Sequence, residues 1–198
     1  MARLVSMSRI AVKYVSEQMV MPTKAFDFYS PTAGGAAIGQ DILALAARSP
    51  IPLVVGTNRD ENKLWSAFDE TIINADNSRW EEFTEEIFGV RAQQARNTYK
   101  ALRPDESLGG LMSAVSTDTG FRQPAQRLCE NRVVNDTPTW MYWFTWPSPA
   151  FGGVIGCCHA LDIPFAFDNL HSEGVSTLTG DGIERADIAN RFASEIVA

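Results

Sequence analysis

Residues that bind metals or form disulfides are scarce in this chain. It has three cysteines and two histidines among 198 residues. An odd number of cysteines leaves at least one thiol free, and the adjacent residues Cys157 and Cys158 are poorly placed to bridge each other. The paired Cys and His spacings of a zinc site are also missing. The sequence therefore predicts small, buried or half-buried thiols, with no disulfide framework and no metal site.

Long apolar runs and an excess of basic residues are absent as well. No apolar run approaches the length that spans a bilayer. Charged side chains interrupt residues 1–20, where a secretory signal needs an unbroken apolar stretch. The 24 acidic and 17 basic residues give a net charge of −7, which suits neither a nucleic-acid backbone nor an anionic membrane surface. We expect neither of these partners, and we expect a cytoplasmic location.

Two segments have the composition of β-strands, and most of the remaining chain has helical spacing. The apolar run 53–56 is expected to be buried on both faces, as in a parallel sheet. The aromatic run 139–146 is expected to form a second strand in the core. Apolar spacing predicts helices over 1–20, 42–47, 64–73, 80–88, 92–102, 105–117, 120–131 and 186–197. This is an α/β chain, but two strands are too few for a sheet with protected edges. We therefore expect an incomplete sheet and self-association through its exposed surface.

One ionisable side chain follows each predicted strand. Glu61 comes after the first, in the turn Gly-Thr-Asn-Arg-Asp-Glu, and His159 lies on a loop after the second. An acid and then a histidine, in this order, match the last two members of a Ser-Asp/Glu-His triad. Each residue also has a structural explanation: Glu61 could stabilise a helix N-terminus, and His159 could be a packed or surface histidine. A thiol nucleophile at Cys157 or Cys158 is disfavoured, because a nucleophile and its base are held within hydrogen-bond reach by separate elements, whereas neighbours in the chain normally point apart.

Longer blocks around these residues resemble a known family, the C-terminal half of type B carboxylesterases. This is the cholinesterase-like and para-nitrobenzyl-esterase-like branch of the α/β-hydrolases. The blocks are Pro-Leu-Val-Val-Gly-Thr-Asn-Arg-Asp-Glu (52–61), Thr-Asp (117–118) with Phe-Arg-Gln-Pro-Ala-Gln-Arg-Leu (121–128), the strand ending in Trp-Pro-Ser-Pro (146–149), and His-Ala-Leu-Asp-Ile-Pro-Phe-Ala-Phe-Asp-Asn-Leu (159–170). The resemblance implies Glu61 as triad acid, His159 as triad base, and Leu64 and Trp65 as substrate-binding residues. It also implies hydrolysis of a small-molecule carboxylic ester through a serine acyl-enzyme, without a cofactor.

The nucleophile of that family has no counterpart in this sequence. The Gly-Glu-Ser-Ala-Gly elbow is absent, and Gly34-Gly35 does not follow a strand as an oxyanion loop would. We therefore expect residues 1–198 to form one partial α/β-hydrolase domain that lacks the nucleophile-bearing half and the extreme C-terminus. Its expected function is that of an ester hydrolase fragment with little or no activity alone. The alternative is a hydrolase-derived interaction module, or a gene fragment, without catalytic activity.

Overall fold

The computed structural model describes residues 34–35 and 39–197, so the helix expected over 1–20 lies outside the described residues. The chain divides into two compact units, residues 1–46 and 47–198. The described part of the first unit contains most of helix α2 (Ile42–Ala47), which has the predicted bounds. Asp41 begins this helix, because its side chain accepts a hydrogen bond of 2.9 Å from the N–H of Ala44.

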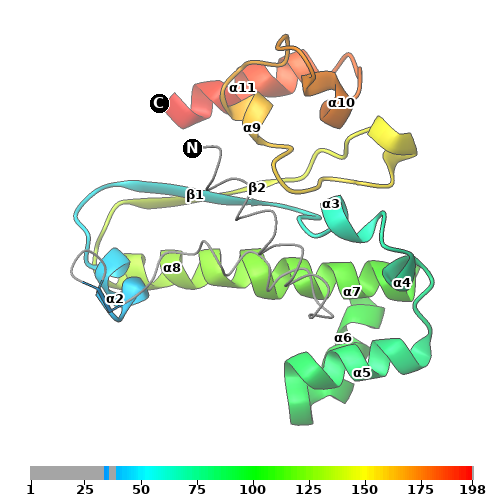
Figure 1. Cartoon of the computed structure of the whole chain (residues 1–198). Helices are drawn as coiled ribbons and strands as arrows, with labels where there is room; N and C mark the ends of the chain where they lie inside the picture. Colours follow the sequence, from blue (N-terminus) through cyan, green and yellow to red (C-terminus); the bar gives the residue numbers. More distant parts are fainter. Residues whose placement is uncertain (1–33, 36–38, 198) are drawn as a thin grey trace, which may run out of the picture. The chain divides into compact units, whose positions relative to one another are not determined.

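The second unit is built on a parallel pair of strands, β1 (Leu53–Asn58) and β2 (Thr139–Phe144) (Figure 1). Leu53 lies opposite Thr139 and Asn58 lies opposite Phe144, and within the described ranges the sheet has these two strands. Parallel pairing brings the carboxyl ends of both strands to the same edge of the sheet. The turn that carries Glu61 and the loop that leads to His159 therefore start side by side.

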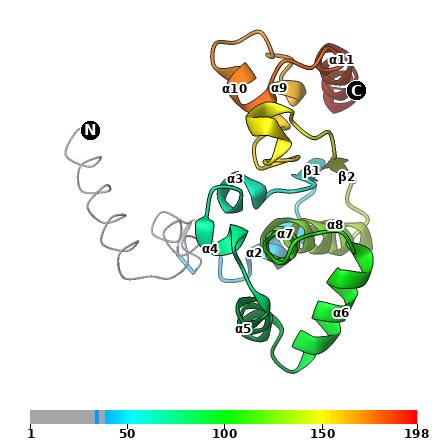
Figure 2. The ribbon, with the colours of Figure 1, turned by 90° about the vertical axis from the view of Figure 1, so that its right-hand side faces the viewer.

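Helices fill the connection between the two strands and follow the second. The connection contains α3 (Lys63–Ser66), α4 (Glu70–Ile73), α5 (Asn77–Phe88), α6 (Ala92–Leu102), α7 (Leu108–Thr117) and α8 (Gln123–Val134). Helix α8 runs along the sheet and contacts both strands, as Figures 1 and 2 show. After β2 come α9 (Ile163–Ala166), α10 (Val175–Thr179) and α11 (Arg185–Val197), and α9 packs against α11.

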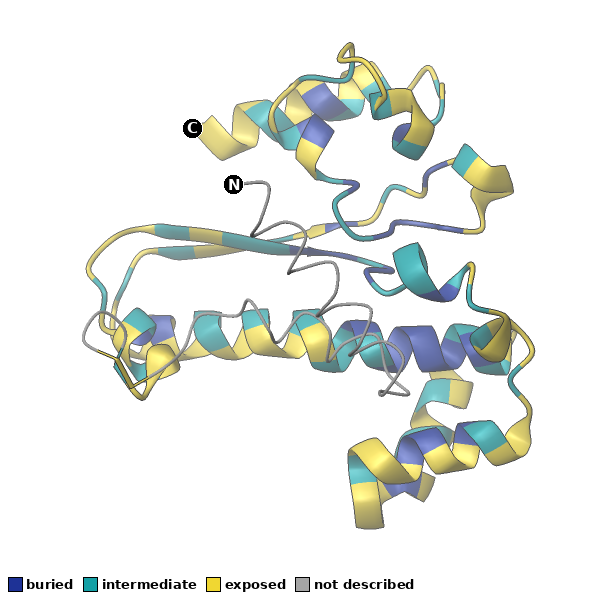
Figure 3. Ribbon diagram, viewed as in Figure 1, coloured by how far each residue is buried: buried dark blue, intermediate teal, exposed yellow. Residues whose placement is uncertain are grey.

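The core of the second unit lies where the end of β2 meets α9 and α11. Phe144 packs against Phe165 of α9 and Phe192 of α11, with ring centroids 5.0 and 5.4 Å apart. Cys157 and Cys158 are buried in the same cluster, which confirms the prediction of small buried thiols at these two positions. Among the helices of the described residues, α7 has the largest share of buried residues, because α4, α5 and α6 pack around it (Figure 3).

Most predicted helices are confirmed, but the prediction of one continuous helix over 64–73 is wrong. The chain forms α3 and α4 there, because Asp69 starts a new helix by accepting the N–H of Thr71 at 2.8 Å. The helix expected from residue 105 begins later, at Leu108, where the Ser107 hydroxyl accepts the N–H of Gly110 at 3.0 Å. The short helices α9 and α10 were not predicted, because a few residues carry too little periodicity.

The expected burial of both strands is also wrong. Val54 is exposed in β1, and the buried residues of that strand are the last two, Thr57 and Asn58. In β2, which ends at Phe144 rather than at residue 146, Trp140 and Trp143 are 58% and 55% exposed. A strand is buried on both faces when a layer of structure packs on each side of the sheet. Helices α9 and α11 cover one face, and they do so near the carboxyl ends of the strands.

A buried arginine ties α8 to the beginning of both strands. The side chain of Arg132 is 2% exposed, and its Nε donates to the Thr139 hydroxyl of β2 at 2.9 Å. Its Nη atoms donate to the carbonyls of Ser49 and Ile51, just before β1. Hydrogen bonds from a charged group contribute more to the stability of the fold than neutral ones do, and their loss leaves buried acceptors without a donor.

We predict that Arg132→Met lowers the free energy of unfolding by about 2–3 kcal/mol, because three acceptors lose their donor. Arg127→Met is the matched control, since Arg127 is exposed on the same helix. It should change stability by less than about 0.5 kcal/mol. Urea unfolding followed by tryptophan fluorescence measures both, and equal effects of the two substitutions would contradict this role of Arg132.

Candidate active site

Glu61 and His159 meet at the carboxyl edge of the sheet. The Oε2 atom of Glu61 lies 2.8 Å from Nδ1 of His159, although the two residues are 98 positions apart. The other oxygen, Oε1, accepts the backbone N–H of Asn58 at 2.7 Å. The Glu61 side chain is 6% exposed and that of His159 is 43% exposed. The imidazole is thus held from the protein side, while part of the ring stays accessible.

Backbone hydrogen bonds fix the two segments that carry this pair. The N–H of His159 donates to the Glu61 carbonyl at 3.2 Å, and the N–H of Asp60 donates to the Cys157 carbonyl at 2.9 Å. The Asp60 carboxylate accepts the N–H of Cys157 at 3.0 Å and lies 3.0 Å from Nε of Arg59. These contacts give Asp60 a structural role, because its carboxylate and its backbone both tie the Glu61 turn to the loop before His159.

Gly156 is required where the two segments approach each other. Its φ is +53°, and a Cβ at this position would lie 2.7 Å from the Asp60 carboxylate. Only glycine adopts this conformation at low cost and also leaves room for the carboxylate. The Gly-Cys-Cys-His sequence therefore serves the close packing of the loop against the Glu61 turn.

The surroundings of His159 raise its pKa above the ordinary value of 6.5. The largest cause is the hydrogen bond with Glu61, and the negative charges of Glu61 and Asp162 act in the same direction. Burial of the ring opposes them. The site thus favours the imidazolium form, as the base of a hydrolase triad requires when it takes up a proton.

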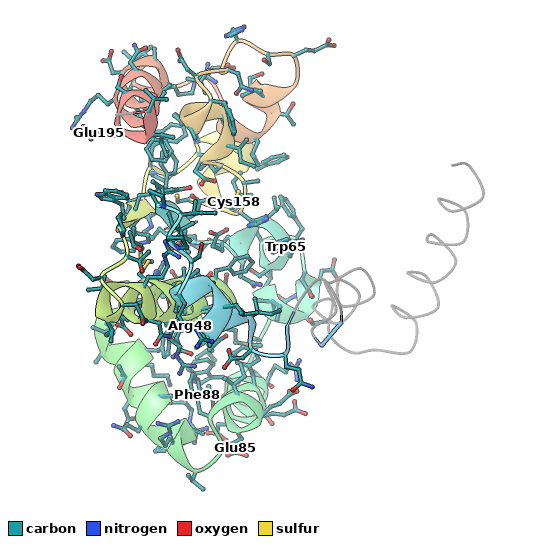
Figure 4. All side chains as sticks on the ribbon, turned by 90° about the vertical axis from the view of Figure 1, so that its left-hand side faces the viewer. Arg48, Trp65, Glu85, Phe88, Cys158 and Glu195 are labelled. Carbon is teal, nitrogen blue, oxygen red and sulfur yellow. The ribbon has the colours of Figure 1, made fainter. Side chains whose placement is uncertain are left out.

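Two aromatic rings flank the imidazole. Trp65 of α3 lies 5.2 Å from the His159 ring and Phe121 lies 5.3 Å from it, while the two aromatic rings stack at 6.3 Å. Figure 4 labels Trp65 and Cys158, the residue before His159. Leu64, by contrast, packs against the Phe144 core. Of the two predicted substrate-binding residues, the structure brings Trp65 to the imidazole.

Phe121 was not predicted as a site residue. It lies in a π-helical turn, Asp118–Arg122, between α7 and α8. Such turns are rare in proteins overall, but those that occur often lie at functional sites. In the same turn, Arg122 donates to the Arg59 carbonyl at 3.0 Å and lies 4.8 Å from the ring of Trp143. The block 121–128 could have drawn attention to Phe121, but helical periodicity does not reveal a π-turn.

The thiols beside His159 are unsuited to act as nucleophiles. Cys157 donates its S–H to the Phe144 carbonyl, at 2.9 Å, and burial raises its pKa to about 12. Burial likewise raises the pKa of Cys158 to about 11. A thiol that stays protonated at neutral pH is a weak nucleophile.

His171, the second histidine, is exposed.

Neither a metal cluster nor a membrane-spanning helix is found in the described part of the chain. No group of three or more His, Cys, Asp and Glu side chains in residues 34–35 and 39–197 is arranged to hold a metal ion. None of the helices in these ranges is both long and apolar enough to cross a bilayer.

Comparison with known proteins agrees with this geometry. No protein-family model matches the chain. The phenmedipham hydrolase of Pseudarthrobacter oxydans is 31% identical over 123 residues, which make up 62% of this chain and 24% of that protein. The crystal structure of the Geobacillus stearothermophilus carboxylesterase EST55 superposes with a TM-score of 0.63 at 26% identity, over 76% of this chain and 31% of the esterase. The chain is related to the carboxylesterases.

A second carboxylesterase relative supports the same assignment. A structure of PNB esterase matches with a TM-score of 0.53 at 28% identity, over 77% of this chain and 30% of that one. The predicted fold class, part of an α/β-hydrolase fold with an incomplete parallel sheet, is confirmed. The matched chain spans about a quarter of the length of the phenmedipham hydrolase and about three-tenths of each esterase.

The raised pKa of His159 predicts a pH-dependent contribution to stability. Because the pKa of His159 is higher in the folded chain than its unfolded-state value of about 6.5, protonation of His159 stabilises the fold. This contribution is fully present below the unfolded-state pKa and is lost as the pH rises through the folded-state pKa. Replacing His159 by Gln should therefore lower the free energy of unfolding more at pH 5.5 than at pH 9. Urea unfolding at both pH values measures this, and a pH-independent difference would contradict the imidazolium–carboxylate contact.

Proposed function

We propose that this chain supplies the acid and the base of a serine carboxylesterase triad, Glu61 and His159. The observation that carries the proposal is the 2.8 Å contact between Oε2 of Glu61 and Nδ1 of His159. With the Nδ1 proton directed at Glu61, Nε2 is free to take the proton of a serine hydroxyl as the serine attacks the ester carbonyl. The imidazolium then returns that proton to the leaving alcohol.

The serine and the oxyanion donors, we propose, come from a segment outside these 198 residues. The sequence has no Gly-x-Ser-x-Gly elbow to present a nucleophile. Two buried oxygens at the end of β1, Oγ1 of Thr57 and Oδ1 of Asn58, have no hydrogen-bond partner in the described ranges. Buried polar atoms are nearly always paired, so donors from a further segment beside β1 fit this site.

The substrate, in this proposal, is a small carboxylic ester with an apolar group against Trp65 and Phe121. The two rings form an apolar wall next to the imidazole, and ring faces favour planar or apolar groups. Leu64 remains a predicted substrate-binding residue, and the cytoplasm remains the predicted location.

The exposed sheet supports a second proposal, that the chain serves as a non-catalytic interaction module. Val54 and Trp140 lie opposite each other on one face of the sheet, and 47% and 58% of their respective surfaces are exposed. Contiguous exposed apolar surface marks interaction sites or favours association. The two proposals differ in what they require, because only the first needs Glu61 and His159.

Reconstitution with a nucleophile-bearing half should separate the two proposals. The chain alone is expected to give no significant hydrolysis of p-nitrophenyl butyrate, since no serine is presented. Grafted onto or co-expressed with the N-terminal half of a related carboxylesterase, it should hydrolyse the ester. In that assembly, Glu61→Gln should lower kcat by about four orders of magnitude and His159→Ala by about six.

The matched control in the assembly is His171→Ala, which removes the other, exposed histidine and should leave kcat unchanged. An active assembly that keeps its rate after His159→Ala would remove this histidine from the proposed role. Robust hydrolysis by the chain alone that is abolished by His159→Ala would show a nucleophile within these residues.

Exposed apolar surface on the sheet predicts that the chain associates with itself in solution. Trp140→Thr should shift static light scattering toward the monomer, because it removes a large apolar side chain of β2 that is 58% exposed. Val90→Thr is the control, since Val90 is fully exposed beyond α5 and away from the sheet. A monodisperse monomer before any substitution would contradict association through the sheet.

A further inference from the structure

The last residue of the π-helical turn, Arg122, ties this turn to the end of β1. Its Nη2 atom donates to the carbonyl of Arg59 at 3.0 Å and lies 3.5 Å from that of Asn58. Both carbonyls lie where β1 ends and the turn toward the triad acid begins. The guanidinium also lies 4.8 Å from the centre of the Trp143 ring, so Arg122 contacts both strands.

Asp118, at the start of the π-helical turn, holds the other side of the guanidinium. Its Oδ1 accepts Nη1 of Arg122, and its Oδ2 accepts the hydroxyl of Tyr99 from α6 at 2.8 Å. Tyr99 stays a donor, because burial and the hydrogen bond to Asp118 raise its pKa above the ordinary value of 10. Arg122 therefore uses two nitrogens to join the π-helical turn to β1, as the fork shape of a guanidinium allows.

A second hydrogen bond attaches the beginning of the π-helical turn to the same segment. Thr117 directly precedes the turn, and its hydroxyl accepts the N–H of Asn62 at 3.0 Å. Asn62 follows the triad acid in the chain, and Thr117 is buried. The π-helical turn is thus fastened at both ends to the segment that carries Glu61.

Phe121 lies between these two attachments and contacts the imidazole. Its ring is 5.3 Å from that of His159 and 6.3 Å from that of Trp65. A phenyl ring has no strong hydrogen bond to hold it, so its place depends on the backbone that carries it and on the rings that it contacts. That backbone is the turn that Arg122 fastens to β1.

We infer that Arg122 is a positioning residue of the candidate active site, which holds the π-helical turn against the end of β1 so that Phe121 packs on the imidazole of His159. The inference rests on the proposed function, because the place of Phe121 matters to an ester only if His159 is the base. A merely structural Arg122 would stabilise the fold without setting the distance from Phe121 to the imidazole.

NMR of the His159 ring protons in the full chain tests this inference without any ester. An aromatic ring shifts the resonances of protons close to it, so Phe121→Leu shows how far the phenyl ring shifts them. Arg122→Met should move the His159 resonances a large part of the way toward their positions in Phe121→Leu, because the turn is no longer held. Arg127→Met is the matched control, since Arg127 is exposed on α8 and should leave these resonances unchanged.

Two conditions make the comparison specific to the aromatic contact. All spectra are recorded above the His159 pKa of each variant, so that a change in protonation does not contribute. The double variant Phe121→Leu/Arg122→Met then separates an effect through Phe121 from a direct effect on the Glu61 turn. With the phenyl ring already removed, the loss of Arg122 should add no further shift.

Unchanged His159 resonances in folded Arg122→Met protein would overturn the inference, and so would a full shift that persists in the double variant. If Arg122→Met does not fold, Arg122→Gln takes its place with the same expected results, because its shorter amide cannot reach both Asp118 and the β1 carbonyls. The readout is the surroundings of the His159 ring, so it is independent of whether the reconstituted assembly hydrolyses an ester.

Discussion

The parallel pairing of β1 with β2 is the constraint on which the rest of this site depends. In a parallel pair both strands end at one edge, so the turn after β1 and the loop after β2 leave the sheet together. This is why two residues 98 positions apart can lie 2.8 Å from each other. A shift of the register by one residue would turn Asn58 to the other face and separate the carboxylates of Glu61 and Asp162 from their shared donor.

Asn58 adds to this constraint at the point where β1 ends. Its N–H and its side-chain amide hold carboxylates on two different segments, and the same amide also binds the Cys158 carbonyl. A buried carboxylate is costly unless it is hydrogen-bonded, and here each oxygen of Glu61 and Asp162 has a partner. The geometry around His159 therefore follows from the hydrogen bonds that these two carboxylates accept at the end of β1, which suits a site that must position a base.

The pairing of Glu61 with His159 and the position of Trp65 beside the imidazole could be predicted from the sequence and its family resemblance, whereas the rest of the surroundings could not. The order of acid and base after two apolar strands is a local signal, and so are helices such as α6, whose predicted bounds match. Phe121 escaped prediction because a π-turn breaks the 3.6-residue period. The network of Tyr142, Asn58 and Asp162 joins side chains up to 104 positions apart, and no periodicity reports such contacts. The incomplete sheet predicted exposed apolar surface, but composition indicates a strand without showing which of its residues are covered, so the exposure of Trp140 in particular could not be predicted.

The most direct test of the account is the tautomer of the neutral His159 ring. The hydrogen bond to Glu61 requires the proton on Nδ1, which leaves Nε2 as the acceptor that a general base needs. Imidazole ¹⁵N chemical shifts, measured in the full chain at a pH above the His159 pKa, distinguish the two tautomers. The account predicts the Nδ1–H form, and its loss in Glu61→Gln. A ring protonated on Nε2 would contradict the account, because Nε2 could then neither accept a proton from a serine nor leave Nδ1 to donate to Glu61.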